Sequence, residues 1–289
     1  MSLLHLMISP TVRLIAFALS FVVALSPCLT MAEAAAPPHA TILVDAATGQ
    51  VLEASNADQR VYPASLTKMM TLYLTFEALH SGRLNWDQRL VVSKNANDKE
   101  PYKFAIGAGN TITVREAVTG MVVLSTNDAA TVIAETLAGS EAAFGQLMTA
   151  KARDLGMANT VFTNPSGLPD PAQVTTATDM ARLGLALIRD FPEEYKLFTL
   201  RNMTFRSMKL RGHNAFLTQY PGADGIKTGY TKASGYNIVT SATRGGRRLV
   251  GVVMGARSGE ARTEEIVGIF ERYLGPRMIQ DITNVKAKP

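Results

Sequence analysis

A serine and a lysine three residues apart are the first residues in the chain whose types and spacing could do chemistry. Ser65 stands before an apolar-periodic stretch that predicts a helix over residues 66–80. Residues three apart share a helix face, so the amine of Lys68 can reach the Ser65 hydroxyl. The amine can take a serine proton only when it is neutral, which requires burial or a second cation nearby. The pair therefore predicts a serine nucleophile with a lysine base.

Two polar triplets further along the chain supply groups that such a pair needs. Ser125-Thr126-Asn127 lies between two predicted helices, where a turn can expose a hydroxyl and an amide together. Lys227-Thr228-Gly229 lies on a predicted strand, where the first two residues offer a cation and a hydroxyl donor to a carboxylate. The glycine leaves room for a close approach by a substrate. Lys227 is also the second cation that would lower the pKa of Lys68.

Each group has an ordinary structural explanation when it is taken alone. Ser65 and the Ser125 triplet fit helix caps, and the Lys227 triplet fits a plain edge strand. Their order, with 60 residues from 65 to 125 and 102 from 125 to 227, is much harder to obtain by chance. Lysine-assisted serine chemistry is therefore the prediction.

Other kinds of site find little support in the sequence. The three histidines that follow the N-terminal stretch are far apart, no HExxH motif occurs, and the chain has a single cysteine, so we expect no metal site. We assign structural roles to His39, His80 and His213. No phosphate-binding loop, dinucleotide fingerprint or GxSxG motif is present, and we expect no cofactor.

The N-terminal stretch is typical of an export signal. Residues 14–25 form an apolar run of about 12 after Arg13, which is shorter than the ~20 residues that span a bilayer. Pro27 and small residues follow, and we predict cleavage after Ala34, with an uncleaved anchor as the alternative. The predicted division is a signal peptide at 1–34 and one catalytic domain at 35–289. We expect an exported protein of the periplasm or extracytoplasmic cell-wall space, with no stable membrane anchor after cleavage.

The composition and the order of elements predict one mixed domain. Of the 289 residues 47% are hydrophobic and 18% charged, which suits a sizeable core, and the net charge of +5 is too diffuse to predict nucleic-acid binding. Predicted strands occur at the start of the chain and after Pro192, with helices between them and a last helix over residues 259–274. This order predicts an α+β fold with a single antiparallel sheet, built from N- and C-terminal strands and covered by helices. The predicted strands are residues 41–45, 50–54, 204–211, 225–230, 236–243 and 248–254.

The motifs and the text around them resemble a known family. Residues 63–71, 164–179 and 222–231 are similar to the D-alanyl-D-alanine carboxypeptidases, the low-molecular-mass penicillin-binding proteins, and the serine, lysine and triplet pattern is their signature. The likeness runs from about residue 40 to 274. It implies a β-lactamase/transpeptidase-like fold and a serine carboxypeptidase that removes the terminal D-alanine from a peptidoglycan stem peptide.

The resemblance also implies a role for each matching residue. Ser65 would attack the peptide carbonyl, Lys68 would act as base, and Ser125 would relay a proton to the leaving amine. The oxyanion would lie between the backbone N–H groups of Ser65 and Tyr230. The residues implied in substrate binding are Asn127, Lys227, Thr228, Gly229, Tyr230 and Arg262. β-Lactams would acylate Ser65, and because the loop after Asn164 carries only Asp170 and no glutamate, rapid β-lactam hydrolysis is not expected.

Two further interpretations stay open on the sequence alone. The same residues could serve a D,D-endopeptidase that cuts peptidoglycan cross-links. A non-catalytic protein that binds penicillin or the cell wall could keep the fold without turnover. The basic stretch at residues 201–211 could contact an anionic surface, or it could be an ordinary solvated strand.

Overall fold

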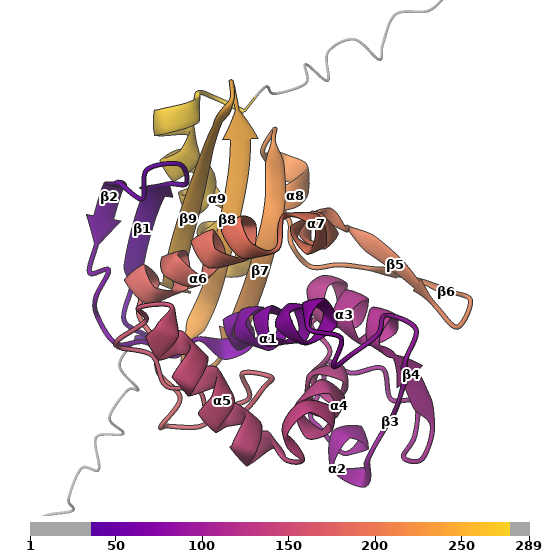
Figure 1. Ribbon diagram of the computed structural model, residues 1–289. Helices are drawn as coiled ribbons and strands as arrows, with labels where there is room; N and C mark the ends of the chain where they lie inside the picture. Colours follow the sequence, from indigo (N-terminus) through magenta and orange to yellow (C-terminus); the bar gives the residue numbers. More distant parts are fainter. Residues whose placement is uncertain (1–35, 278–289) are drawn as a thin grey trace, which may run out of the picture. The chain divides into compact units, whose positions relative to one another are not determined.

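A five-stranded antiparallel sheet forms the centre of the computed structural model, which describes residues 36–277 (Figure 1). Its strand order is β2-β1-β9-β8-β7, so the first two strands of the chain pair with the last three. This confirms the sheet of terminal strands that the sequence predicts. The strands are β1 (Ala40–Asp45), β2 (Val51–Ser55), β7 (Ala223–Thr231), β8 (Gly235–Arg244) and β9 (Arg247–Ala256).

Helices cover both faces of the sheet, and strand alternation decides which residues meet them. On β1, Ile42 and Val44 belong to the core shared with α6 (Ala177–Asp190), whereas Leu43 belongs to the core beneath α9 (Gly259–Leu274). Figure 1 shows α6 in front of the sheet and α9 behind it. Both faces of the sheet are therefore buried, and β7 lies at one edge of the sheet.

The second half of the fold is a group of helices around α1 (Lys68–His80). The sequence suggests one apolar stripe for this helix, but its residues from 68 to 76 are all buried, because neighbouring elements surround it. The capping box at Thr113 is present as predicted and opens α3. The surrounding helices are α3 (Val114–Val123), α4 (Asn127–Ala138) and α5 (Glu141–Asp154).

One predicted strand is wrong, and several short elements escape sequence reasoning. Residues 204–211 form a separate hairpin of β5 (Asn202–Phe205) and β6 (Met208–Arg211), because Arg206 and Ser207 have φ of 45° and 70° and turn the chain. That turn carries none of the Gly, Asn or Asp residues that usually mark it. The short elements are β3 (Arg89–Val91), β4 (Thr111–Thr113), α2 (Lys94–Asn97), α7 (Pro192–Tyr195), α8 (Phe216–Gln219) and the 3₁₀ turns η1 (Ala64–Thr67) and η2 (Lys196–Thr199).

The predicted signal peptide, residues 1–34, lies outside the described part of the chain. Between residues 36 and 277, no helix combines the length and the apolar character needed to cross a membrane.

Candidate active site

Ser65 lies in the 3₁₀ turn η1, directly before the long buried helix α1. Ala64, which precedes it, has a positive φ of 50°, an uncommon conformation for a residue with a side chain. Lys68 directly follows this turn and is the first residue of α1. The Nζ atom of Lys68 lies 3.2 Å from Ser65 Oγ. The predicted contact between serine and lysine is therefore present.

The Lys68 side chain is fully buried, and three oxygens surround its amine. Besides Ser65 Oγ, Nζ lies 2.7 Å from Asn127 Oδ1 and 2.6 Å from the backbone oxygen of Ser166. Those last two oxygens can only accept hydrogen bonds. A neutral amine has two hydrogens for them and one lone pair, which is then free to accept the Ser65 proton.

The electrostatics of the site favour that neutral amine. Burial lowers the pKa of Lys68 well below its usual value, and the positive charge of Lys227 lowers it further. Asp128 acts in the opposite direction but more weakly. The environment of Lys68 therefore favours the neutral amine that a lysine base requires.

The loop that carries Ser166 is fixed by its own turn residues. Asn164 Oδ1 accepts hydrogen bonds from the backbone N–H groups of Ser166 and Gly167, at 3.2 and 2.8 Å. Thr71 Oγ1 donates to the Pro165 oxygen at 2.6 Å and so joins the loop to α1. The sequence predicts this loop but not the role of Ser166. The group that contacts Lys68 is the backbone oxygen of Ser166, which every residue type has.

Ser125 and Asn127 reach the site from the start of α4. Ser125 has φ of 64°, and its Oγ is buried without a hydrogen-bond partner among the described residues. The Asn127 amide Nδ2 donates to the backbone oxygens of Glu100 and Pro101, at 2.9 and 3.2 Å. The Oδ1 atom of Asn127 therefore orients Lys68, while the Nδ2 atom of Asn127 contacts the loop that contains Glu100 and Pro101.

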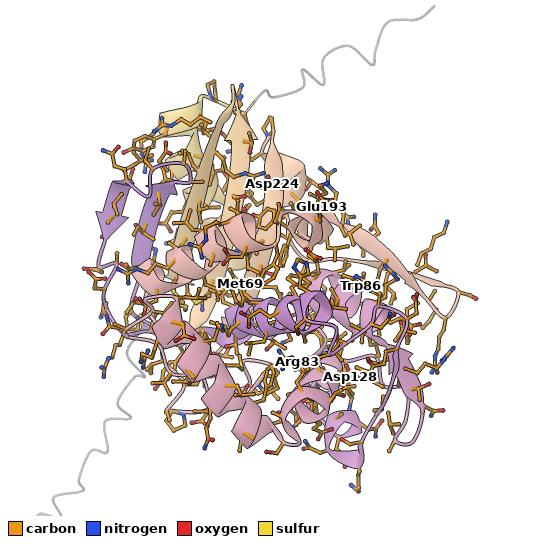
Figure 2. All side chains as sticks on the ribbon, viewed as in Figure 1. Met69, Arg83, Trp86, Asp128, Glu193 and Asp224 are labelled. Atoms are coloured by element: carbon orange, nitrogen blue, oxygen red, sulfur yellow. The ribbon has the colours of Figure 1, made fainter. Side chains whose placement is uncertain are left out.

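That loop is attached to α4 by Asp128, which Figure 2 labels below α1. Its Oδ2 accepts hydrogen bonds from the N–H groups of Phe104 and Ala105, at 2.7 and 3.1 Å. Burial raises the pKa of this carboxyl group. Asp128 thus supports, from outside the cavity, the loop that holds Asn127.

Two buried cations lie close together beside the cavity. Lys227 on β7 is 3% exposed, and burial together with the charge of Arg262 lowers its pKa to about 7. Arg262 on α9 is 7% exposed, burial lowers its pKa to about 10, and its Nε has no hydrogen-bond partner in the described part of the chain. Such a pair is suited to a ligand that carries a carboxylate.

The open space between these elements is a cavity of about 300 Å³. Gly229 lets β7 lie close to η1, because a Cβ at this position would lie 3.0 Å from the Ser65 nitrogen. Seven residues expected at the site line the cavity, and Lys68 and Lys227 are buried next to it. The seven are Ser65, Ser125, Asn127, Thr228, Gly229, Tyr230 and Arg262.

One histidine has a different place from the one expected. His39 and His80 pair with Glu265 and Glu194 on the surface, as structural roles predict. His213 instead lines the cavity, and its ring lies 5.0 Å from that of Tyr102 on the same wall. Burial and the nearby Lys227 lower its pKa. The sequence places His213 near no motif, so only the fold shows it.

Comparison with known proteins agrees with this geometry. The family of D-alanyl-D-alanine carboxypeptidases matches residues 29–258. The chain belongs to this family. Its relative D-alanyl-D-alanine carboxypeptidase DacA of Haemophilus influenzae is 39% identical over 264 residues, which cover 87% of this chain and 67% of the relative. The chain spans about two thirds of the length of the curated relatives that it matches most strongly.

Solved structures of penicillin-binding proteins share the fold. Penicillin binding protein 5 from Haemophilus influenzae has a TM-score of 0.78 and 36% identity, over 83% of this chain and 71% of that one. Penicillin-Binding Protein D2 from Listeria monocytogenes, solved with cefotaxime bound, has a TM-score of 0.74 and 32% identity, over 80% of this chain and 95% of that one. The predicted α+β fold of the penicillin-binding proteins is confirmed.

Proposed function

We propose that this protein is a serine D-Ala-D-Ala carboxypeptidase that removes the terminal D-alanine from peptidoglycan stem pentapeptides. The observation that carries the proposal is the fully buried Lys68 amine, whose two acceptor oxygens direct its lone pair toward Ser65. Family membership and the two cations beside the cavity support the same substrate. No cofactor is needed, because the chain's own groups supply the nucleophile and the base.

The first step forms an acyl-enzyme. Ser65 Oγ attacks the carbonyl carbon of the penultimate D-alanine while its proton moves to Lys68. The terminal carboxylate binds near Thr228, with Lys227 and Arg262 supplying positive potential. The backbone N–H groups of Ser65 and Tyr230 stabilise the oxyanion, and losing one such donor typically raises a barrier by roughly 3 kcal/mol.

The next steps release the products. Ser125, whose Oγ has no partner among the described residues, passes the proton from Lys68 to the leaving D-alanine amine as the C–N bond breaks. Water then attacks the ester carbonyl carbon and gives a proton to Lys68. As the ester C–O bond breaks, Lys68 returns this proton to Ser65 Oγ and the shortened peptide leaves. A β-lactam presents a carbonyl and a carboxylate to the same groups and would acylate Ser65. The Listeria relative, solved with cefotaxime bound, supports binding of a β-lactam by this fold.

The test uses a stem pentapeptide and a fluorescent penicillin with the purified protein. We expect released D-alanine from the first and a covalent adduct on Ser65 from the second, read by mass spectrometry. A cross-linked muropeptide dimer tests the endopeptidase alternative in the same assay. Penicillin labelling without D-alanine release would contradict the proposal and favour a binding protein without turnover.

We also propose that the protein works outside the cytoplasmic membrane, where its substrate lies. The apolar run at residues 14–25 and the small residues after Pro27 support export. Fractionation of cells that produce the full chain should show a form shortened by about 34 residues in the periplasmic or cell-wall fraction. A full-length protein retained in the cytoplasm would contradict this.

Lys227→Met is expected to move the acidic limb of the acylation profile to higher pH. Lys227 lowers the pKa of Lys68, so its removal raises that pKa and leaves more of the base protonated at a given pH. The KM for the pentapeptide should also rise about tenfold or more, because the carboxylate loses a charged partner. The measurement is the rate of penicillin acylation and peptide hydrolysis across a pH series.

The matched control for this prediction is Lys196→Met, whose side chain is exposed and pairs with Glu193. It should leave both the pH limb and KM unchanged. If the acidic limb of the pH profile is not shifted in Lys227→Met, Lys227 does not lower the pKa of Lys68.

A further inference from the structure

A buried asparagine, Asn237, joins the central sheet to the turn that carries Ser65. Asn237 lies on β8 and is 0% exposed. Its Nδ2 atom donates hydrogen bonds to the backbone oxygens of Tyr62 and Pro63, at 3.0 and 3.2 Å. Tyr62 and Pro63 directly precede η1 in the chain. A side chain of the sheet therefore holds the backbone just before the nucleophile.

The contacts of Asn237 fix the orientation of its amide and require both of its ends. Its Oδ1 atom accepts a hydrogen bond from the Gly255 nitrogen at 2.9 Å, where the pairing of β8 with β9 changes register. The Gly255 N–H group can only donate, and the two backbone oxygens at Nδ2 can only accept. An aspartate would keep the contact with Gly255 and lose the two others.

The neighbouring strand approaches the same turn at the same point. Gly229 on β7 is the register partner of Asn237. A Cβ at Gly229 would lie 3.0 Å from the Ser65 nitrogen and 3.2 Å from the Pro63 oxygen. That oxygen also accepts a hydrogen bond from the Leu66 nitrogen at 3.2 Å, within the turn. The position of η1 on the sheet is thus set by close approach to β7 and by hydrogen bonds to β8.

This position matters because the two N–H groups assigned to the oxyanion belong to different elements. Ser65 lies in η1, whereas Tyr230 lies on β7, directly after Gly229. Both donors must lie within about 3 Å of one developing oxyanion. A small shift of η1 along or away from the sheet would change the spacing of the two donors.

We propose that Asn237 is a positioning residue that sets the spacing of the two oxyanion donors, Ser65 N–H and Tyr230 N–H. Asn237 does not line the active-site cavity, so it acts through the backbone of Tyr62 and Pro63. The inference rests on the proposed carboxypeptidase function, since that function assigns the oxyanion to these N–H groups.

The test uses Asn237→Asp, which keeps the size of the side chain and places carboxylate oxygens against two backbone oxygens. We expect kcat for the pentapeptide to fall about 100-fold, as a displacement of about 1 Å at a reacting centre allows. KM should change less than about threefold, because Thr228, Lys227 and Arg262 still bind the carboxylate. Asn237→Ala removes the contacts without adding a charge and should lower kcat in the same way, by about tenfold or more.

A peptide boronic acid supplies a readout that a purely structural role would not move. It forms a tetrahedral adduct with the Ser65 oxygen and so resembles the oxyanion intermediate. Its affinity should fall by about the same factor as kcat/KM in both Asn237 variants. Rates are taken per mole of enzyme that a fluorescent penicillin titrates in a long incubation, so that an unfolded fraction does not count.

The matched control is Thr240→Val on the same strand. Thr240 is 0% exposed, and its Oγ1 atom donates to the Gly225 oxygen, so this variant also loses a buried hydrogen bond of the sheet. It should lower the unfolding temperature and leave kcat and the boronic acid affinity unchanged. An equal loss of boronic acid affinity in Thr240→Val would mean that any weakening of the sheet suffices, and would overturn the inference.

The remaining outcomes separate this inference from the proposed function. Asn237 variants with a raised KM and an unchanged kcat, or with no change in either, would overturn the positioning role and leave the carboxypeptidase intact. Unfolding of both variants would also overturn it, since Asn237 would then serve the fold as a whole. If the unaltered protein releases no D-alanine, the proposed function fails and this inference fails with it.

Discussion

Ser65→Ala and Lys68→Met are each expected to lower acylation and D-alanine release by at least about 10³-fold. Ser65 supplies the oxygen that forms the acyl bond, and Lys68 is placed 3.2 Å from it to take the proton. Because the two groups act in one step, the double variant should be no slower than the slower single variant. The measurement is single-turnover acylation by a fluorescent penicillin together with release of D-alanine.

The control for this prediction is again Lys196→Met, which removes an exposed lysine that does not line the cavity and should keep full activity. Circular dichroism should show that each variant stays folded. Losses that multiply in the double variant would mean that serine and lysine act in separate steps. Substantial acylation of Lys68→Met would mean that another group is the base.

Gly167→Ala is expected to lower both the free energy of unfolding and the rate of acylation. Gly167 has φ of 85°, and a Cβ there would lie 1.9 Å from the Ala64 backbone oxygen. The left-handed conformation and the overlap together should lower the free energy of unfolding by about 2–5 kcal/mol. The loop would have to move away from η1 and take the Ser166 oxygen away from Lys68. A displacement of about 1 Å there should lower acylation roughly 100-fold.

Gly49→Ala is the matched control, because Gly49 has a similar φ of 74° but nothing within 4 Å of the added carbon. It should lower the free energy of unfolding by about 1–2 kcal/mol, from backbone strain alone, and leave acylation unchanged. Urea unfolding and penicillin acylation measure the two effects. Equal behaviour of the two variants would show that the contact between Gly167 and Ala64 is not needed for the site.

The long and periodic elements are those that the sequence predicts well. The last helix has the predicted bounds, Gly259–Leu274, since the glycine and proline that end it follow it directly in the chain. The prediction of one strand over residues 204–211 is wrong for the opposite reason. Their reversal at Arg206 and Ser207 involves residue types that do not usually adopt a positive φ, so no local signal marks it.

The burial of α1 shows the same limit at the next level of structure. An apolar period in the sequence shows which face of a helix is buried, because the other face carries polar residues. A helix that is surrounded by other elements has no polar face, so its sequence shows little periodicity. The complete burial of Lys68 could therefore not be read from its neighbours in the chain. It follows from the packing of other elements around α1, to which α3, α4, α5 and α6 contribute.

The sequence by itself determined the chemical groups, their order along the chain and the class of fold. The contact between Ser65 and Lys68 arises within one turn, and the sheet follows from strands at both ends, so local patterns predict both. Only the tertiary structure decided the protonation state of Lys68 and the shape of the site. The two oxygens that orient Lys68 come from residues 59 and 98 positions away, and desolvation depends on everything packed around the amine. The same holds for the place of His213 in the cavity wall, because distant segments form a cavity only after the chain has folded.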